Sequence, residues 1–252
     1  MHGNFVWYEL MTTDTKAAEA FYTNVVGWSA RDASMPGIEY TLFYAGDRQV
    51  AGLMTMPDGA LDMKVPPAWL GYVAVDDVDA AAAKIAAEGG NVHRAPDDIP
   101  GVGRFAIVTD PHGAAFALFK GTGEAPPLDQ MAPGNTGWHE LMAGDLDTAF
   151  EFYSKLFGWT KDQAMDMGEM GVYQIFASGG KQIGGMMTKP KDIPAPYWLY
   201  YFNVEALDAA IERTKSGGGQ IVLEPMEVPG GAWIVQCTDP QGALFALVAP
   251  KR

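Results

Sequence analysis

The chain has 252 residues, of which 48% are hydrophobic, so it can build a core of one or two domains and is not a disordered polymer. Its 17 Lys and Arg residues against 31 Asp and Glu residues give a formal net charge of −14, which excludes binding to a nucleic-acid backbone. The lone Cys237 excludes an intramolecular disulfide, and the lack of a long apolar run or leader pattern predicts a cytoplasmic protein without a membrane partner.

The N-terminal part of the chain predicts a strand, a helix and two more strands. Residues 5–11 form a β-rich run, and Asp14 then offers an N-cap for a helix that ends at Gly27. Residues 40–44 and 50–56 are predicted strands separated by a turn around Gly46. The segment therefore predicts a helix after the first strand, followed by a meander.

The segment that follows repeats this order. Residues 69–75 predict a strand, and residues 76–88 predict an Ala-rich helix that is closed by a pair of glycines. Residues 105–109 and 114–119 predict two further strands, which the turn Asp110-Pro-His-Gly113 joins. Such a unit has one apolar sheet face that must be buried against another layer.

The whole pattern then occurs a second time. Segments of the first half match segments of the second half at a nearly constant spacing: Trp7-Tyr-Glu-Leu-Met with Trp138-His-Glu-Leu-Met, Gly27-Trp28 with Gly158-Trp159, and Asp110-Pro with Asp239-Pro. A repeat that spans half of the chain is a duplicated domain. We predict a first domain at residues 1–122, a Gly- and Pro-rich linker at 123–135 and a second domain at 136–252.

The order of elements, the Asp-Pro-x-Gly turns and the Phe-Tyr and Gly-Trp pairs of the first helix resemble the vicinal oxygen chelate superfamily, which includes glyoxalase I, bleomycin-resistance proteins and extradiol dioxygenases. The resemblance implies an α+β fold with two tandem glyoxalase/bleomycin-resistance-like domains. Each domain would consist of two βαβββ units that form an open, U-shaped sheet.

Enzymes of this superfamily typically hold one divalent metal with His and Glu side chains on particular strands. Here the predicted strands at residues 50–56, 69–75 and 114–119, and their counterparts at 183–188, 197–204 and 243–249, contain no His, Asp, Glu or Cys. Ala117 and Ala246 stand near the place of the last glutamate. One carboxylate in each cavity, Glu9 or Glu140, is too few for an ordinary metal site. We therefore expect no metal ligands and no cofactor, with a divalent metal as the alternative although its usual ligand positions are empty.

Glu9 and Glu140 are the candidate catalytic residues. Strand alternation places Trp7, Glu9 and Met11 on one face, so an aromatic side chain adjoins an acid that could act as a general base or pair with a cationic ligand. A glutamate hydrogen-bonded at a domain seam is the structural alternative. The candidate ligand-binding residues lie on the first strand of each unit: Trp7, Trp69, Trp138 and Trp198.

Three functions remain open. We favour metal-independent binding of a small aromatic or cationic molecule in an aromatic cleft with one carboxylate. The alternatives are a lyase or isomerase of the glyoxalase I type that uses Glu9 or Glu140 as a proton shuttle, and a structural or interaction protein with vestigial clefts. The duplication predicts a monomer whose two domains mimic a family dimer, with a homodimer as the alternative.

Overall fold

The first repeat forms an eight-stranded mixed sheet in a computed structural model, which describes residues 1–35, 37–62, 65–123 and 129–252. Along the sheet the strands are ordered β2, β3, β4, β1, β5, β8, β7 and β6. Their bounds in chain order are β1 Phe5–Thr12, β2 Ser29–Asp32, β3 Tyr40–Ala45, β4 Arg48–Thr55, β5 Ala68–Ala74, β6 Asn91–Ile99, β7 Gly103–Thr109 and β8 Ala115–Gly121.

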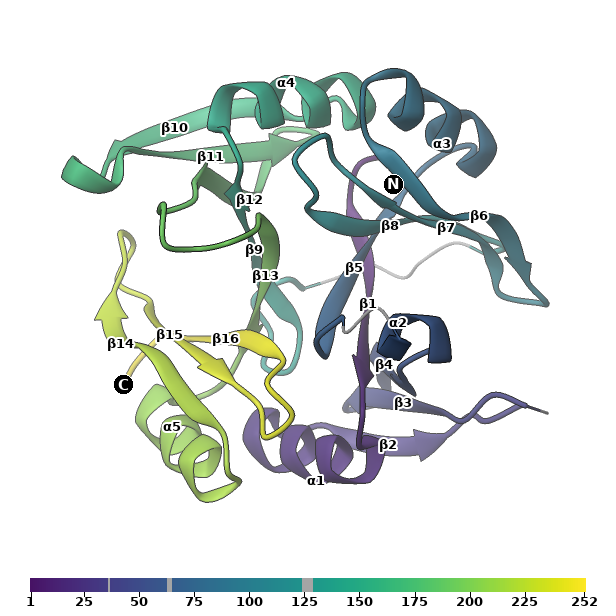
Figure 1. The fold of residues 1–252 in the computed structure, drawn as a ribbon. Helices are drawn as coiled ribbons and strands as arrows, with labels where there is room; N and C mark the ends of the chain where they lie inside the picture. The colour runs from purple at the N-terminus through teal and green to yellow at the C-terminus, as the bar shows by residue number, and fades with distance from the viewer. Residues whose placement is uncertain (36, 63–64, 124–128) are drawn as a thin grey trace. The chain divides into compact units, whose positions relative to one another are not determined.

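The second repeat forms a second sheet with the corresponding order, β10, β11, β12, β9, β13, β16, β15 and β14 (Figure 1). Its strands are β9 Thr136–Ala143, β10 Thr160–Asp166, β11 Val172–Ser178, β12 Lys181–Thr188, β13 Tyr197–Asn203, β14 Gln220–Glu227, β15 Trp233–Thr238 and β16 Leu244–Ala249. The predicted α+β fold with two tandem copies of the same sheet is confirmed.

Four helices follow the first strands of the four βαβββ units. They are α1 Thr15–Val26, α3 Val78–Ala87, α4 Leu146–Phe157 and α5 Leu207–Ser216, and the short α2 Asp58–Asp62 and the 3₁₀ turn Gly168–Met170 lie elsewhere. The predicted caps of α1 are confirmed, because the Asp14 side chain accepts the N–H of Ala17 at 3.0 Å and Gly27 has a left-handed φ of 87°. The strand after each helix has mostly exposed side chains, so hydrophobic periodicity could not delimit it.

The pairing of β1 with β4 fixes which residues adjoin Glu9. These strands run parallel, with Glu9 opposite Gly52 and Met11 opposite Met54, and in the second repeat Glu140 of β9 is opposite Gly185 of β12. The hairpin from β3 to β4 is antiparallel and places Tyr40 opposite Met54. Tyr40 therefore lies two strands away from β1, with β4 between the two strands.

The chain packs as two compact units that do not follow the boundary between the repeats. One unit combines α3 and β6–β8 of the first repeat with α4 and β10–β12 of the second. The other combines α1 and β2–β4 with α5 and β14–β16, and β1, β5, β9 and β13 contribute residues to both units. The helices α3 and α4 lie side by side within the first of these units, and α1 and α5 within the second (Figure 1).

Each unit has an aromatic core. In the unit with α1 and α5, the rings of Tyr22, Trp28, Phe43, Trp69, Phe202 and Phe245 contact one another with centroids 5.0 to 6.3 Å apart. In the unit with α3 and α4, the matching rings are Tyr153, Trp159, Phe176, Trp198 and Phe116, which Phe5 and Phe157 join. These rings supply most of the large buried side chains.

A buried carboxylate joins the two repeats inside each unit. The Tyr22 hydroxyl donates to Asp239 Oδ2 at 3.1 Å, and the Tyr153 hydroxyl donates to Asp110 Oδ2 at 3.2 Å. Both aspartates begin an Asp-Pro-x-Gly turn, and the other carboxylate oxygen accepts two backbone N–H groups of that turn at 2.9 Å. The turn therefore has a packing role across the repeats, which sequence periodicity does not reveal.

No described helix is long and apolar enough to cross a membrane. Residues 124–128 of the predicted linker lie outside the described residues. The described part of the linker contributes contacts to the unit with α1 and α5, because Gly134 O accepts the Trp28 indole N–H at 2.8 Å and the Gln130 side chain donates to Gly137 O at 2.9 Å.

Candidate functional site

A tryptophan, a tyrosine and a glutamate form a hydrogen-bonded triad on β1 and β3. The Tyr40 hydroxyl donates to Glu9 Oε2 at 2.9 Å, and the Trp7 indole N–H donates to the Tyr40 oxygen at 3.3 Å. Glu9 is 9% exposed, whereas Trp7 and Tyr40 are partly exposed. The triad therefore holds a shielded carboxylate beside two aromatic rings that a ligand can contact.

The second repeat builds the same triad. The Tyr173 hydroxyl donates to Glu140 Oε2 at 3.0 Å, and the Trp138 indole N–H donates to the Tyr173 oxygen at 2.8 Å. Glu140 is 6% exposed. Each triad lies within one compact unit, that of Glu9 in the unit with α1 and that of Glu140 in the unit with α4.

A glycine makes room for the tyrosine in both triads. A Cβ atom at Gly52 would overlap the Tyr40 hydroxyl and ring, and a Cβ atom at Gly185 would overlap the Tyr173 ring. Gly52 is opposite Glu9, and Gly185 is opposite Glu140. Each tyrosine ring therefore crosses the strand next to the glutamate at a glycine, which has no side chain in its way. The glycine therefore sets the approach of the phenol to the carboxylate.

Burial and the glutamate charge keep both tyrosines protonated. Burial raises the pKa of Tyr40 well above its ordinary value, and the charge of Glu9 adds to this shift. The pKa of Tyr173 is raised for the same two reasons, with Glu140 as the charge. A protonated phenol has one O–H group, and here that group donates its hydrogen bond to the glutamate. The hydroxyl therefore orients the carboxylate, which is the acceptor in this bond.

The second triad has an extra neighbour. Tyr197, at the start of β13, is partly exposed, and its burial together with the charge of Glu140 raises its pKa to about 12. In the alignment of the repeats that pairs Trp69 with Trp198, the first repeat has Ala68 in this place. At this position Glu140 therefore has an aromatic neighbour, whereas the first repeat has an alanine.

The structure brings together four of the six residues predicted for the site. Trp7 joins Glu9, and Trp138 joins Glu140, through two tyrosines that were not among the predicted site residues. Tyr40 and Tyr173 are as far apart in the chain as Gly52 and Gly185 are. The repeat therefore indicated that the two tyrosines occupy matching positions. The roles of the four residues in catalysis or binding stay predictions.

Trp69 and Trp198 lie in the aromatic cores. They are 5% and 7% exposed, and their indole N–H groups donate to Tyr22 at 2.9 Å and to Tyr153 at 3.1 Å. These tyrosines are the ones that bond the buried aspartates, so each tryptophan has a packing and hydrogen-bonding role inside its unit. Their predicted role in ligand binding stays a prediction.

His139 lies beside Glu140 in sequence but not in the triad. Its ring stacks on Phe5 with centroids 4.1 Å apart, and its Nδ1 lies 2.5 Å from Ile183 O. Burial lowers the pKa of His139 to about 4, so the ring is neutral at pH 7. The placement of His139 on the opposite strand face from Glu140 agrees with strand alternation.

The donor groups of the triads do not fit an ordinary divalent metal site. Strands β4, β5, β8, β12, β13 and β16 carry no His, Asp, Glu or Cys, and one carboxylate oxygen of each triad already accepts a phenol proton. Among the described residues, no three His, Cys, Asp or Glu side chains are grouped to hold a metal. A divalent metal needs several such ligands, and each triad supplies a single carboxylate.

The family model of the glyoxalase/bleomycin resistance protein/dioxygenase superfamily matches this sequence at residues 4–118 and 135–247. The chain belongs to this superfamily. The putative glyoxylase CFP32 of Mycobacterium tuberculosis is 34% identical over 246 residues, which cover 97% of this chain and 94% of the relative. The anthracycline biosynthesis protein DauV of a Streptomyces species is 32% identical, and the match covers 96% of this chain and 91% of the relative.

A solved structure of the superfamily shares the fold. The Mn(II)-bound glyoxalase from Novosphingobium aromaticivorans superposes with a TM-score of 0.63 at 17% identity, covering 99% of this chain and 82% of that one. At this identity the likeness concerns the fold alone. The Mn(II) ion of that glyoxalase therefore gives no information about metal binding by this chain.

Proposed function

We propose that the two triads bind a small molecule that has an aromatic ring and a cationic or hydrogen-bond-donating group, without a catalytic metal. The observation that carries this proposal is the donation of a tyrosine hydroxyl to a shielded glutamate, built twice with the same tryptophan behind it. A fixed carboxylate attracts a cation, and the partly exposed rings offer stacking and cation–π contacts. The relative named for anthracycline biosynthesis supports an aromatic ligand.

Calorimetric titration with daunorubicin, an anthracycline that has a planar aromatic ring system and a protonated amino sugar, tests the binding. We expect Glu9→Gln and Glu140→Gln each to weaken binding at one triad by a factor of about 10 to 100, because a charged acceptor contributes about 1.5–3 kcal/mol. The double variant should lose most of the binding enthalpy. Glu224→Gln, which changes an exposed carboxylate on β14, is the matched control and should bind as the natural protein does. Unchanged binding by the double variant contradicts the proposal.

Metal analysis tests the second half of the proposal. Elemental mass spectrometry of the untagged protein, purified without added ions, should find far less than one transition-metal ion per chain, because the triads supply one carboxylate each. About one equivalent of a single metal would contradict metal independence. A Glu9→Gln and Glu140→Gln double variant that lost such a metal would identify its ligands.

A proton-transfer activity of the glyoxalase I type is the second candidate. The shielding of Glu9 and Glu140 favours it, because a carboxylate held away from water by aromatic rings can act as a general base. The carboxylate would take a proton from one carbon of a methylglyoxal–thiol adduct and return it to the adjacent carbon. Isomerisation of this adduct above background, with loss in the double variant, supports the candidate, and no activity counts against it.

A further inference from the structure

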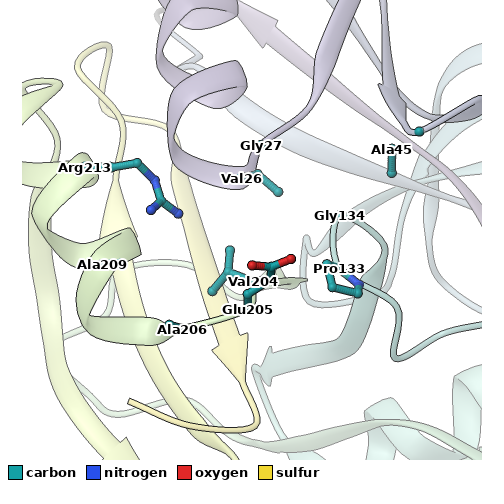
Figure 2. Close-up of a pocket in the computed structure, with 11 residues that line it drawn as sticks. Val26, Gly27, Ala45, Pro133, Gly134, Val204, Glu205, Ala206, Ala209 and Arg213 are labelled. Carbon is teal, nitrogen blue, oxygen red and sulfur yellow. The ribbon is translucent and has the colours of Figure 1, made fainter.

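A cleft lies away from the triads, in the unit that contains α1 and α5. It has a volume of about 380 Å³, which is the size of a small-molecule site. It is lined by the end of α1, the turn between β3 and β4, residues 133–134 and the start of α5. Figure 2 shows two charged side chains in it, Arg213 of α5 and Glu205 just before that helix.

The matching place in the other unit is filled by the chain itself. In the alignment of the repeats that pairs Gly27 with Gly158, Phe157 corresponds to Val26 and His2 corresponds to Pro133. The rings of His2 and Phe157 meet edge to face with centroids 6.4 Å apart. His2 also lies 3.2 Å from Leu156 O through Nε2 and 3.4 Å from the Asp76 carboxylate through Nδ1.

Two replacements empty this place in the unit with α5. Val26 stands where Phe157 supplies a ring, and Pro133 stands where His2 supplies a nitrogen donor. The carboxylate is kept, because Glu205 corresponds to Asp76. The cleft therefore keeps the carboxylate but lacks the aromatic ring and the imidazole that stand in this place in the other unit.

Arg213 adds a positive charge on the other wall. Its Nη2 donates to Val25 O at 2.9 Å, the carbonyl that corresponds to Leu156 O, which fixes the guanidinium at the cleft. Its Nε is buried and has no hydrogen-bond partner among the described residues. In the described part of the chain, neither Arg213 nor Glu205 takes part in an ion pair, although both line the same cleft. An arginine of this kind in a concave site is suited to bind the carboxylate of a ligand.

We propose that this cleft binds a free amino acid with an aromatic side chain. The ammonium group would pair with Glu205 in place of the His2 imidazole, the carboxylate would pair with Arg213, and the ring would lie against Val26, the residue that corresponds to Phe157. The apolar contacts come from Val26, Ala45, Pro133 and Val204. The cleft is independent of the triads, so this site is distinct from the one in the proposed function.

The test is an NMR titration of the ¹⁵N-labelled protein with L-phenylalanine. Three glycine amides line the cleft and report on it, those of Gly27, Gly46 and Gly134. We expect these signals to shift with saturation, and the affinity to fall by about tenfold in Arg213→Gln, because one charged contact is lost. Lys84→Gln changes the corresponding residue of the other unit and should leave the affinity unchanged.

Two ligand analogues and one filled variant complete the experiment. 3-Phenylpropionate lacks the ammonium group and phenethylamine lacks the carboxylate, so each should bind more weakly than phenylalanine. Val26→Phe introduces the residue of the other unit and should abolish the shifts. The proposal is overturned if phenylalanine shifts none of the three glycine signals, if Arg213→Gln binds as well as the natural protein, or if either analogue binds as well as phenylalanine.

Discussion

The position of the Glu9 carboxylate depends on a glycine of the neighbouring strand. Gly52 lies opposite Glu9, and the Tyr40 ring crosses β4 at that glycine to reach the carboxylate at 2.9 Å. The same relation holds for Gly185, Glu140 and Tyr173. The site is therefore specified by a glutamate, a tryptophan, a tyrosine and a glycine in each repeat and not by the glutamate alone.

Replacing Gly52 with alanine should displace Tyr40. Because the new Cβ would overlap the phenol, we expect Gly52→Ala to lower the free energy of unfolding by about 1–3 kcal/mol and to weaken daunorubicin binding. Urea denaturation and calorimetry measure the two effects. Gly59→Ala is the matched control, since nothing lies within 4 Å of a Cβ there. Natural stability and binding in Gly52→Ala would show that the tyrosine does not need this space.

Sequence reasoning at the residue scale identified the acids better than their partners. Glu9 and Trp7 alternate on one strand, so their shared face followed from the period of β-structure. Tyr40 joins them from 31 residues away, through a hairpin whose register is decided by backbone pairing. Trp69 was predicted to bind a ligand but lies in the aromatic core. Its place there depends on Tyr22 of α1 and on Phe202 of the other repeat, which are distant in the sequence.

At the scale of elements, the two helices that follow β5 and β13 differ at the N-cap residue that precedes each helix. Asp77 caps α3 by accepting the N–H of Ala80 at 2.9 Å. Ala206 has the same extended backbone before α5, with φ −146° and ψ 126°, but it has no side-chain acceptor. The two copies therefore share the helix but not the cap.

Adding a cap should stabilise α5. We expect Ala206→Asp to raise the free energy of unfolding by about 1 kcal/mol, and Asp77→Ala to lower it by about the same amount, because a capping side chain satisfies one free N–H group of the first turn. Urea denaturation of both variants gives the comparison. If Asp77→Ala destabilises the protein while Ala206→Asp has no stabilising effect, the start of α5 is already satisfied in another way.

At the scale of the whole molecule, the repeats are units of sequence but not of packing. Each compact unit contains one helix and its strands from the first repeat and one helix and its strands from the second. A buried tyrosine–aspartate hydrogen bond joins the segments of the two repeats inside each unit. Burial raises the pKa of Asp239, while the Tyr22 hydroxyl and the backbone N–H groups of the turn stabilise its charged form. The pairs therefore connect the repeats through buried polar groups that satisfy one another.

Separated repeats should not fold independently. We expect residues 1–122 and residues 136–252, produced as two chains, to lack dispersed NMR spectra alone and to gain them on mixing, because each would expose the aromatic surface of both units. Circular dichroism and NMR spectroscopy of each chain and of the mixture check this. Native-like spectra of either chain alone would show that a single repeat is a folding unit.

The sequence by itself determined the duplication, the superfamily, the helix after the first strand of each unit, the caps of α1 and the strands with buried side chains, because these depend on local periodicity and on residues close together in the chain. It also placed Trp7 beside Glu9 and Trp138 beside Glu140. Only the tertiary structure decided that tyrosines complete the triads, that Trp69 and Trp198 are core residues, and that one unit has a cleft where the rings of His2 and Phe157 meet in the other. These features arise from contacts between distant segments, whose partners are chosen by the packing of the folded chain and leave little trace in local patterns.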